Sequence, residues 1–494
     1  MFDLDAEVRF EQSPQREWSS YQLEIFTASA QSAQSAKNLM VQAVAGSGKS
    51  TTLEELSNRL GDSMLLAFNK AIAGDLKDRG LNARTFNSLG WQLWRDNRPG
   101  VTLDAQKSRK LLEEMIGKSQ VFWDFGTDVC RLVSLMKSSA FGIGSSVHVS
   151  EVEDLIEAYG LDIPPDRRIE LSTLAVQLFT RSVSCETTYD YDDQLYIPIH
   201  RNWAYPTYSN LLVDEYQDLN PIQDLIIKRM HKDGSRIIGV GDRWQSIYGF
   251  RGAMTDSMDR AILDLDMLEL PLSISYRCSR MVVDEAKLLC PHIEARPNAP
   301  DGDVHRLELD PAEWRPDHMI LCRNNAPLFR AILKELRAGR PCRVLSNFLD
   351  NIEKFVKKHS KGITSIEDFR KRLDKWYEVE VANLDAKGVP RRSGKRAGLL
   401  DRYDTYIALC ERNQTVGNLL QTVTELTKGK TGPLFSTIHK AKGLESEHVH
   451  LLRPDLLPAF WADGESALTQ ERNLHYVAVT RAKLEFAYGE RATV

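Results

Sequence analysis

The sequence predicts an α/β protein with two blocks, each a mostly parallel β-sheet with helices on its faces and each carrying a mainly helical insertion. Short apolar runs that end in small or polar residues, and that precede a helix-like stretch, are typical of buried parallel strands. Two series of such runs occur along the chain. Each is interrupted by a long stretch whose apolar residues repeat at helical spacing.

The predicted strands fall into two groups of four. The first group lies in KNLMVQAVAG (37–46), SMLLAFNK (63–70), SNLLVDE (209–215) and SRIIGVGD (235–242). The second group lies in HMILCRN (318–324), PLFSTIH (433–439), HVHLLRP (448–454) and LEFAY (484–488). Because strands alternate with helical patterns, each group is predicted to form one sheet between layers of helices.

The domain boundaries follow from the two interruptions. The first block is predicted to comprise residues 1–92 and 205–271, with an insertion at 93–204. The second block is predicted to comprise 272–345 and 434–494, with a small insertion at 346–433. The second insertion is basic, since 14 Lys or Arg stand against 9 Asp or Glu between residues 349 and 402. Such a run is either a solvated helix face or a surface that contacts nucleic acid.

Composition excludes several classes of protein. The 494 residues carry a net charge of −5, which excludes a globally basic nucleic-acid coat but leaves room for a local basic channel. No apolar run approaches the ~18 residues of a membrane span, and the acidic N-terminal segment is unlike a signal peptide. The seven Cys form no C-x-x-C pair, which argues against disulfides, a zinc site and an iron–sulfur cluster. We expect a cytoplasmic protein with no membrane contact and no metal cluster.

A phosphate-binding loop is predicted at Ala43–Ser50 (AVAGSGKS), between a predicted strand and a predicted helix. The segment fits the P-loop pattern except at Ala43, where the pattern has Gly. Backbone N–H groups at the start of the helix would hold phosphates. Lys49 would reach the β- and γ-phosphates, and the Ser50 hydroxyl would ligate Mg²⁺. The alternative is a tight strand-to-helix turn that happens to contain glycine.

An acidic pair follows another predicted strand, at Asp214 and Glu215. Asp214 is predicted to hold Mg²⁺, and Glu215 to orient and deprotonate an attacking water. Adjacent carboxylates on a surface loop are usually only solvated. Carboxylates that leave a buried strand in a chain with a P-loop favour catalysis.

Further segments in chain order match a known set of motifs. The segment Val213–Asp218 (VDEYQD) has the pattern DExxQD. The other segments are Gln22, Phe68–Ala71, Thr85–Asn87, Val240–Ala253, Ser275–Arg277, Thr437–Glu445 and Tyr476–Ala482. Together they resemble the motifs of the UvrD/Rep/PcrA-like superfamily 1 (SF1A) DNA helicases. The matches run from Gln22 to Arg481 and so cover nearly the whole chain.

The resemblance implies a fold of two RecA-like domains, with ATP and Mg²⁺ as cofactors. It implies that the phosphates are held by Ala45, Gly46, Ser47, Gly48, Lys49, Ser50 and Thr51. It also implies that Gln22 and Tyr276 contact the adenine and Glu445 the ribose. Gln245 would contact the γ-phosphate, while Arg277 and Arg481 would reach from the second block to stabilise charge on the transferring phosphoryl group.

The resemblance also implies a DNA track. Phe68, Tyr248 and Phe250 would stack on successive bases, which is a sequence-tolerant contact. Thr85, Arg251 and His439 would contact the strand or its backbone. Asn69 and Phe86 lie in the two DNA-contacting motifs that follow the P-loop.

The implied function is an ATP-dependent 3′–5′ single-stranded DNA translocase and helicase in DNA repair or replication. It would act on single strands and on single-strand/duplex junctions, and a protein loading partner is compatible with that role. Some features depart from the family pattern. Asn87 replaces a frequent His, the second insertion is small, and residues 483–494 follow the last motif. We therefore expect the usual strand-separating hairpin to be absent or to lie elsewhere, and we expect no helicase–nuclease. The first insertion contains Asp190–Asp193 (DYDD), which matches a minor family motif.

Three other functions remain open at this point. The chain could be a translocase that displaces proteins without unwinding duplex. It could be a DNA-bound module whose state is gated by the nucleotide. It could also be a small-molecule kinase, although a kinase has no need of paired arginines on a second block.

Overall fold

The computed structural model describes residues 17–30, 37–67, 69–159, 161, 163–231, 235–247, 256–306, 314–345, 348–386, 388–429 and 431–489. Two parallel six-stranded sheets form the centres of two blocks. All eight predicted strands are present within these sheets. The predicted α/β fold is therefore confirmed.

The first sheet has the strand order β3-β2-β6-β7-β1-β8. The strands at the two edges of this sheet, β3 and β8, lacked a clear apolar run and were not predicted. The bounds of the strands are β1 Leu39–Ala43, β2 Ser63–Ala67, β3 Ala83–Thr85, β6 Asn210–Val213, β7 Arg236–Gly241 and β8 Leu268–Leu272. The helices of this block are α1 Ser20–Ser29, α2 Lys49–Leu60, α3 Lys70–Asp78, α4 Phe86–Asn97, α10 Pro221–Met230 and α11 Ser257–Asp264. Helix α4 runs across residue 92, where the sequence placed the end of the first segment.

The second sheet has the order β11-β16-β15-β12-β14-β13, and a small β9-β10 pair lies beside it. Its strands are β11 Asp303–His305, β12 His318–Cys322, β13 Arg343–Val344, β14 Leu434–Thr437, β15 Ser446–Leu452 and β16 Ala482–Tyr488. The pair is β9 Ile274–Ser275 with β10 Glu294–Ala295, and the helices are α12 Arg280–Lys287, α13 Asn325–Arg337, α18 Ile438–Ala441 and α19 Glu465–Val479.

The first insertion is helical and contains a short strand pair. Its elements are β4 Thr102–Leu103, α5 Lys107–Ile116, α6 Gln120–Ser138, α7 Val149–Ala158, α8 Arg168–Ser184, β5 Thr188–Tyr189 and α9 Asp193–His200. Buried ion pairs hold these helices together. Lys107 Nζ lies 2.6 Å from Asp193, and Lys137 Nζ lies 3.1 Å from Asp190.

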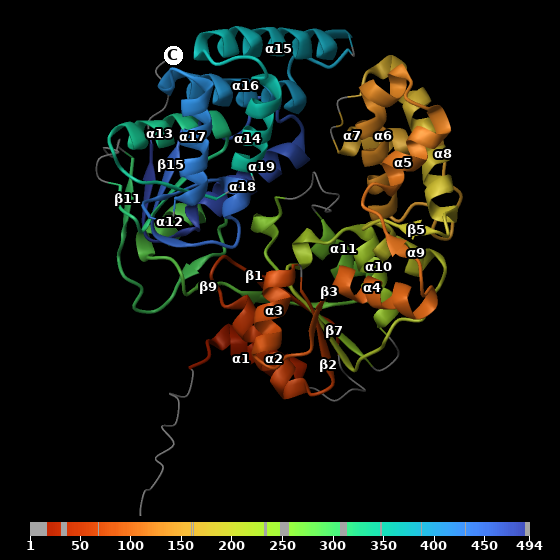
Figure 1. Ribbon diagram of the computed structural model, residues 1–494. Coiled ribbons are helices and arrows are strands. Elements are labelled where there is room, and N and C mark those ends of the chain that lie inside the picture. Colours follow the sequence, from red (N-terminus) through yellow and green to blue (C-terminus); the bar gives the residue numbers. More distant parts are fainter. Residues whose placement is uncertain are drawn as a thin grey trace, which may run out of the picture.

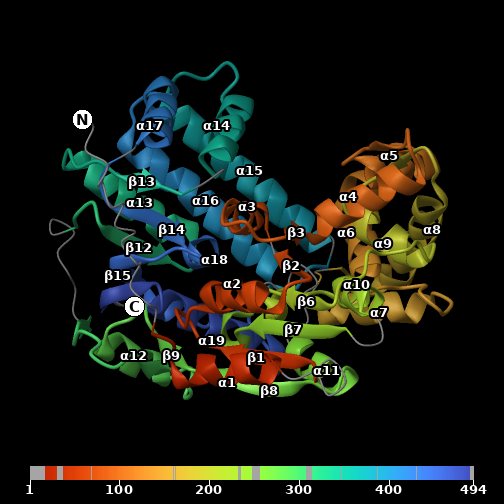
Figure 2. The ribbon, with the colours of Figure 1, turned by 90° about the horizontal axis from the view of Figure 1, so that it is seen from below.

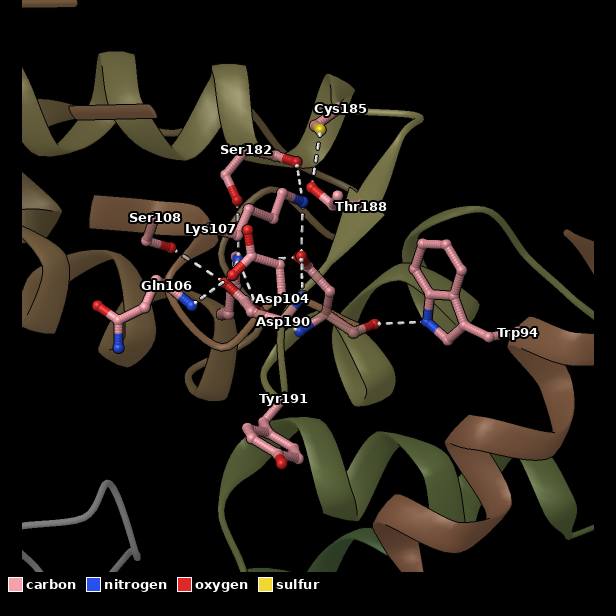
Figure 3. A network of polar contacts seen from close by, with 12 residues as sticks. Trp94, Asp104, Gln106, Lys107, Ser108, Ser182, Cys185, Thr188, Asp190 and Tyr191 are labelled. Atoms are coloured by element: carbon pink, nitrogen blue, oxygen red, sulfur yellow. Dashed lines mark hydrogen bonds and ion pairs between the residues drawn. The ribbon is translucent and has the colours of Figure 1, made fainter. Parts of the chain in front are cut away.

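Figure 3 shows that network, with Tyr191 lying apart from it. The carboxylates of Asp190 and Asp193 in the DYDD segment are thus paired inside the insertion, because buried charges need partners. Tyr191 between them is 57% exposed.

In the described residues of the second insertion there are four helices, α14 Phe348–His359, α15 Ile366–Ala386, α16 Gly394–Arg412 and α17 Val416–Lys428. Figure 1 shows α15 crossing the top of the molecule above α16, while the first insertion (orange and yellow) stands to the right of it. Figure 2 shows the first block between the second block and the first insertion. Among the described residues, none of the helices has the length and apolarity to cross a membrane.

Candidate functional site

A pocket of about 770 Å³ lies between the two blocks. First-block residues that line it include Gly46, Ser47, Gly48, Lys49, Ser50, Thr51, Glu215 and Gln245. Second-block residues that line it include Tyr276, Arg277, Lys442, Glu445 and Arg481. The fold therefore brings most of the predicted nucleotide-contacting residues to one place, although they are up to 435 positions apart (Gly46 to Arg481) in the sequence.

The P-loop joins β1 to α2 and fits a phosphate group. Gly46 and Gly48 have φ of 72° and 85°, values that favour glycine. A side chain at Gly46 would place its Cβ 2.5 Å from Arg277 Cβ, so the second block packs directly on the loop. The N-cap of α2 is Gly48, which has no side chain to bind the first-turn N–H groups. Within the described residues, the buried Ser47 Oγ also has no hydrogen-bond partner.

The acidic pair follows β6 and lies against Lys49. Lys49 Nζ is 2.9 Å from each carboxylate oxygen of Glu215. Burial alone would raise the pKa of Glu215, but the positive charges of Lys49 and Lys442 outweigh it and hold that pKa well below its ordinary value. Burial and the negative charge of Glu215 raise the pKa of Asp214 to about 7. Glu215 also has a φ of 51°, a left-handed conformation that is uncommon outside glycine.

A chain of hydrogen bonds connects Glu215 with Gln245. Gln217 Nε2 donates to Glu215 Oε2 at 2.5 Å, and the Asp242 N–H donates to Gln217 Oε1 at 2.9 Å. Gln245 Nε2 then donates to Asp242 Oδ2 at 2.5 Å. Two of these three hydrogen bonds are buried, and together they connect Glu215 with Gln245 over a short path. Gln217 and Asp242 both lie within the matched motifs, but sequence reasoning assigned them no role.

The two predicted arginines reach the pocket from the second block. Arg481 is 1% exposed, and its Nη2 donates to Gln245 Oε1 at 3.3 Å. Burial and the nearby Arg277 lower the pKa of Arg481 to about 10, so it is still charged at neutral pH. Arg277 Nε donates to Glu445 Oε2 at 2.7 Å, and its Nη1 donates to the carbonyl of Thr480 at 3.2 Å.

Further contacts across the cleft were not predicted. Lys442 Nζ lies 2.5 Å from Asp218 Oδ2 and 2.8 Å from the carbonyl of Gln245. Asn473 Nδ2 donates to the carbonyl of Ser246 at 2.9 Å. Lys442 lies in one of the matched motifs, so the sequence could have indicated a role for it. Asn473 lies outside the matched motifs, and no sequence pattern pointed to it.

At the other end of the pocket, Tyr276 is 41% exposed and Glu445 is paired with Arg277 and with Lys483, 2.8 Å away. Gln22 is buried beside the P-loop. Its Nε2 donates to Thr52 Oγ1 at 3.1 Å, and its Oε1 accepts the Ser19 N–H at 3.1 Å. Gln22 is therefore close to the P-loop but already bonded to its neighbours.

Four of the predicted DNA contacts, Phe68, Tyr248, Phe250 and Arg251, lie outside the described residues. Asn69 and Thr85 are helix N-caps, since Asn69 accepts the Ile72 N–H at 2.9 Å and Thr85 accepts the Ser88 N–H at 3.1 Å.

The other two predicted contacts are more buried. Phe86 is only 3% exposed and packs in the core, so its ring is not presented to a base in this structure. His439 is half-buried, and burial together with Arg323 lowers its pKa to about 4. It is therefore a neutral donor or acceptor at pH 7.

The basic segment of the second insertion, residues 387–396, contains Lys387, Arg391, Arg392, Lys395 and Arg396. Lys395 Nζ lies 3.1 Å from Asp128 on α6 of the first insertion, and Arg396 Nη2 lies 2.5 Å from Asp385. Arg392 Nε donates to the carbonyl of Phe460 at 2.5 Å, while Arg391 is exposed. Two of these cations thus already meet carboxylates of the chain itself, Asp128 and Asp385. Lys387 lies outside the described residues.

Comparisons with known proteins identify two family models. Residues 151–265 match the UvrD/REP helicase N-terminal domain, and residues 351–487 match the UvrD-like helicase C-terminal domain. These ranges include the acidic pair, Gln245, Lys442 and Arg481.

Individual relatives agree with the family models. F-box DNA helicase protein 1 of Schizosaccharomyces pombe is 25% identical over 92% of this chain and 56% of its own length. DNA helicase II of Escherichia coli is 36% identical over 29% of this chain and 21% of its own. DNA helicase IV of the same organism is 24% identical over 44% of this chain and 39% of its own. The chain thus spans about half or less of the length of these relatives.

Proposed function

The chain belongs to the UvrD-like helicases, and from that premise we propose that it hydrolyses ATP to move along single-stranded DNA and to separate duplex strands. One observation carries the proposal. The pocket contains a P-loop and a carboxylate from one block and two arginines from the other. Such a site is complete only when the blocks are closed, so hydrolysis and domain movement depend on each other.

The geometry of the pocket supports the following proposed roles. The first turn of α2 and Lys49 would bind the phosphates, and Ser50 with Asp214 would hold Mg²⁺, which neutralises phosphate charge when bound. Glu215 would take a proton from the attacking water. A metal ion would also favour the charged form of Asp214, whose pKa burial raises.

Charge stabilisation in the transition state would come from Arg277 and Arg481. Both cations lie on the wall of the pocket that belongs to the second block. Gln245 touches Arg481 and is linked to Glu215, so it would report the state of the nucleotide to the segment that follows it. That segment contains Tyr248, Phe250 and Arg251, the proposed DNA contacts.

The test uses the full chain with and without single-stranded DNA. We expect ATP hydrolysis to rise in the presence of an oligonucleotide and duplexes with a 3′ single-stranded tail to be unwound, with Lys49→Ala as the inactive control. Displacement of streptavidin from biotinylated strands without unwinding would favour the translocase alternative. Hydrolysis that does not respond to DNA would contradict a DNA motor, and preference for a 5′ tail would reverse the polarity.

The interaction of Lys442 with Asp218 gives a prediction about coupling. Lys442→Ala is expected to lower DNA-stimulated hydrolysis at least about tenfold, because a hydrogen bond to a charged group contributes about 1.5–3 kcal/mol to the closed arrangement. The affinity of this variant for ATP should change less, because the P-loop belongs to the first block. The measurement is the ATPase rate against DNA concentration, with Lys287→Ala on α12 as the control. If Lys442→Ala kept the parent's rate of DNA-stimulated ATP hydrolysis, the Lys442–Asp218 ion pair would not contribute to closure of the two blocks.

The basic segment gives a prediction about duplex binding. We expect Arg391→Ala/Arg392→Ala to flatten the salt dependence of binding to a forked duplex, by up to about 0.9 in log–log slope for each phosphate that is no longer neutralised. Lys395→Ala/Arg396→Ala should change the slope less, because those cations already meet Asp128 and Asp385. Binding is measured by anisotropy at several salt concentrations. Identical slopes for the first pair and the parent would show that Arg391 and Arg392 do not neutralise duplex phosphates.

A further inference from the structure

A group of histidines lies on one face of the second sheet, away from the predicted site. His318 begins β12, His448 and His450 lie on β15, and Glu485 lies on β16. The register pairs His318 with His448 and His448 with Glu485 across three neighbouring strands. These side chains, together with Arg315 and His305, line a pocket of about 290 Å³.

The Nδ1 atoms of His318 and His448 are each hydrogen-bonded to a neighbouring side chain. Glu485 Oε2 lies 2.8 Å from His448 Nδ1, and His450 Nε2 lies 3.2 Å from His318 Nδ1. A partner on one ring nitrogen fixes the orientation of the other, which is how metal-binding histidines are commonly arranged. The Nε2 atoms of both rings are left to face a common point.

The carboxylate of Asp317 and the guanidinium of Arg315 lie close to these two Nε2 atoms. Asp317 Oδ2 lies 3.6 Å from His448 Nε2. The guanidinium of Arg315 donates from Nε to His318 Nε2 at 3.3 Å, and its Nη2 lies 3.5 Å from His448 Nε2. The positive charge of Arg315 therefore occupies the point on which the ring nitrogens converge. Its side chain is 63% exposed and can rotate into solvent.

We propose that Asp317, His318 and His448 form a binding site for a divalent transition metal ion of the zinc type, with Arg315 as the competing cation. One ligand atom from each residue already lies within 4.8 Å of the other two. Bonds of about 2.0–2.2 Å to zinc require these atoms to approach further, which side-chain rotation allows once Arg315 has left. Two imidazoles and one carboxylate suit zinc, cobalt or nickel, whereas magnesium and calcium prefer oxygen ligands.

The ion would cross-link the second block. It would tie the turn before β12 to β15. The site is distinct from the proposed nucleotide site, because Glu447 lines the nucleotide pocket while His448 lines the histidine pocket. Successive residues of a strand point to opposite faces of the sheet. The cysteine count could not reveal this site, since none of its ligands is a cysteine.

Zinc titration of the full, chelator-treated chain tests the proposal, with calorimetry for affinity and thermal unfolding as a second readout. We expect one zinc site in the parent that raises the melting temperature. Glu485→Gln should weaken it about 10- to 100-fold, as loss of an outer partner does, and His448→Ala should weaken it more. Arg315→Ala should tighten it, since the competing cation is gone while the backbone turn from Arg315 to His318 is kept.

His148→Ala is the matched control, because His148 is an exposed histidine of the first insertion. It should keep the parent's affinity. A parent that binds no zinc, or a His448→Ala variant with unchanged stoichiometry and affinity, would overturn the proposal. If His448→Ala fails to fold, unchanged zinc affinity in both Arg315→Ala and Glu485→Gln overturns it equally.

Discussion

Replacing Glu215 with Gln is expected to reduce the maximal rate of ATP hydrolysis by about 100- to 10,000-fold, the usual contribution of a general base. The amide has the shape of the carboxylate but cannot take a proton from water. ATP affinity should be kept or rise, because Lys49 is no longer held by a full negative charge at 2.9 Å. Lys49→Ala should behave differently and lose both binding and hydrolysis, since the ammonium group pairs with phosphate.

The measurements are single-turnover hydrolysis and equilibrium binding of a fluorescent ATP analogue. Glu55→Gln is a suitable control, because Glu55 lies on the outer side of α2 in an ion pair with Arg59. If Glu215→Gln turned over ATP at nearly the parent's rate, the base would have to be another group.

Arg277→Ala is expected to lower the maximal ATPase rate by about 1,000-fold or more, the range found for an arginine that stabilises a transferring phosphoryl group. ATP affinity should fall far less, because the charge on the phosphoryl oxygens grows mainly in the transition state. Arg277 is the better test of the two arginines. Arg481 is fully buried and also bonds the carbonyls of Val477 and Leu444, so its loss would disturb the fold.

The control for Arg277 is Arg280→Ala, three residues further on and paired with Asp301 at the surface. Steady-state kinetics with saturating DNA separates a role in the transition state from a role in ATP binding, because a transition-state role lowers kcat and leaves KM nearly constant. An equal loss of kcat in both variants would point to a general effect on the second block. A large rise in KM with constant kcat would assign Arg277 to ground-state binding.

Local chemistry was enough to predict much of this protein. The segment Ala43–Ser50 contains its own strand end, glycines and helix start, so the phosphate loop could be recognised without knowing its surroundings. The buried strands with continuous apolar runs were equally visible, because burial on both faces leaves an uninterrupted apolar run. The same reasoning missed β3, β8, β11 and β13. These strands are either short or mix polar with apolar residues, and they are recognised only by their pairing with a neighbouring strand.

The tertiary structure decided which side chains meet. The ion pair of Lys442 with Asp218 joins residues 224 positions apart, and Asn473 reaches the carbonyl of Ser246 over 227. The histidine pocket is assembled from β11, β12, β15 and β16, and no local pattern marks it. Likewise, the charge of Lys395 could be counted from the sequence, but its pairing with Asp128 could not. Sequence patterns record the periodicity of a single element, whereas a contact between distant residues depends on strand order and register, which are set by the packing of all elements together.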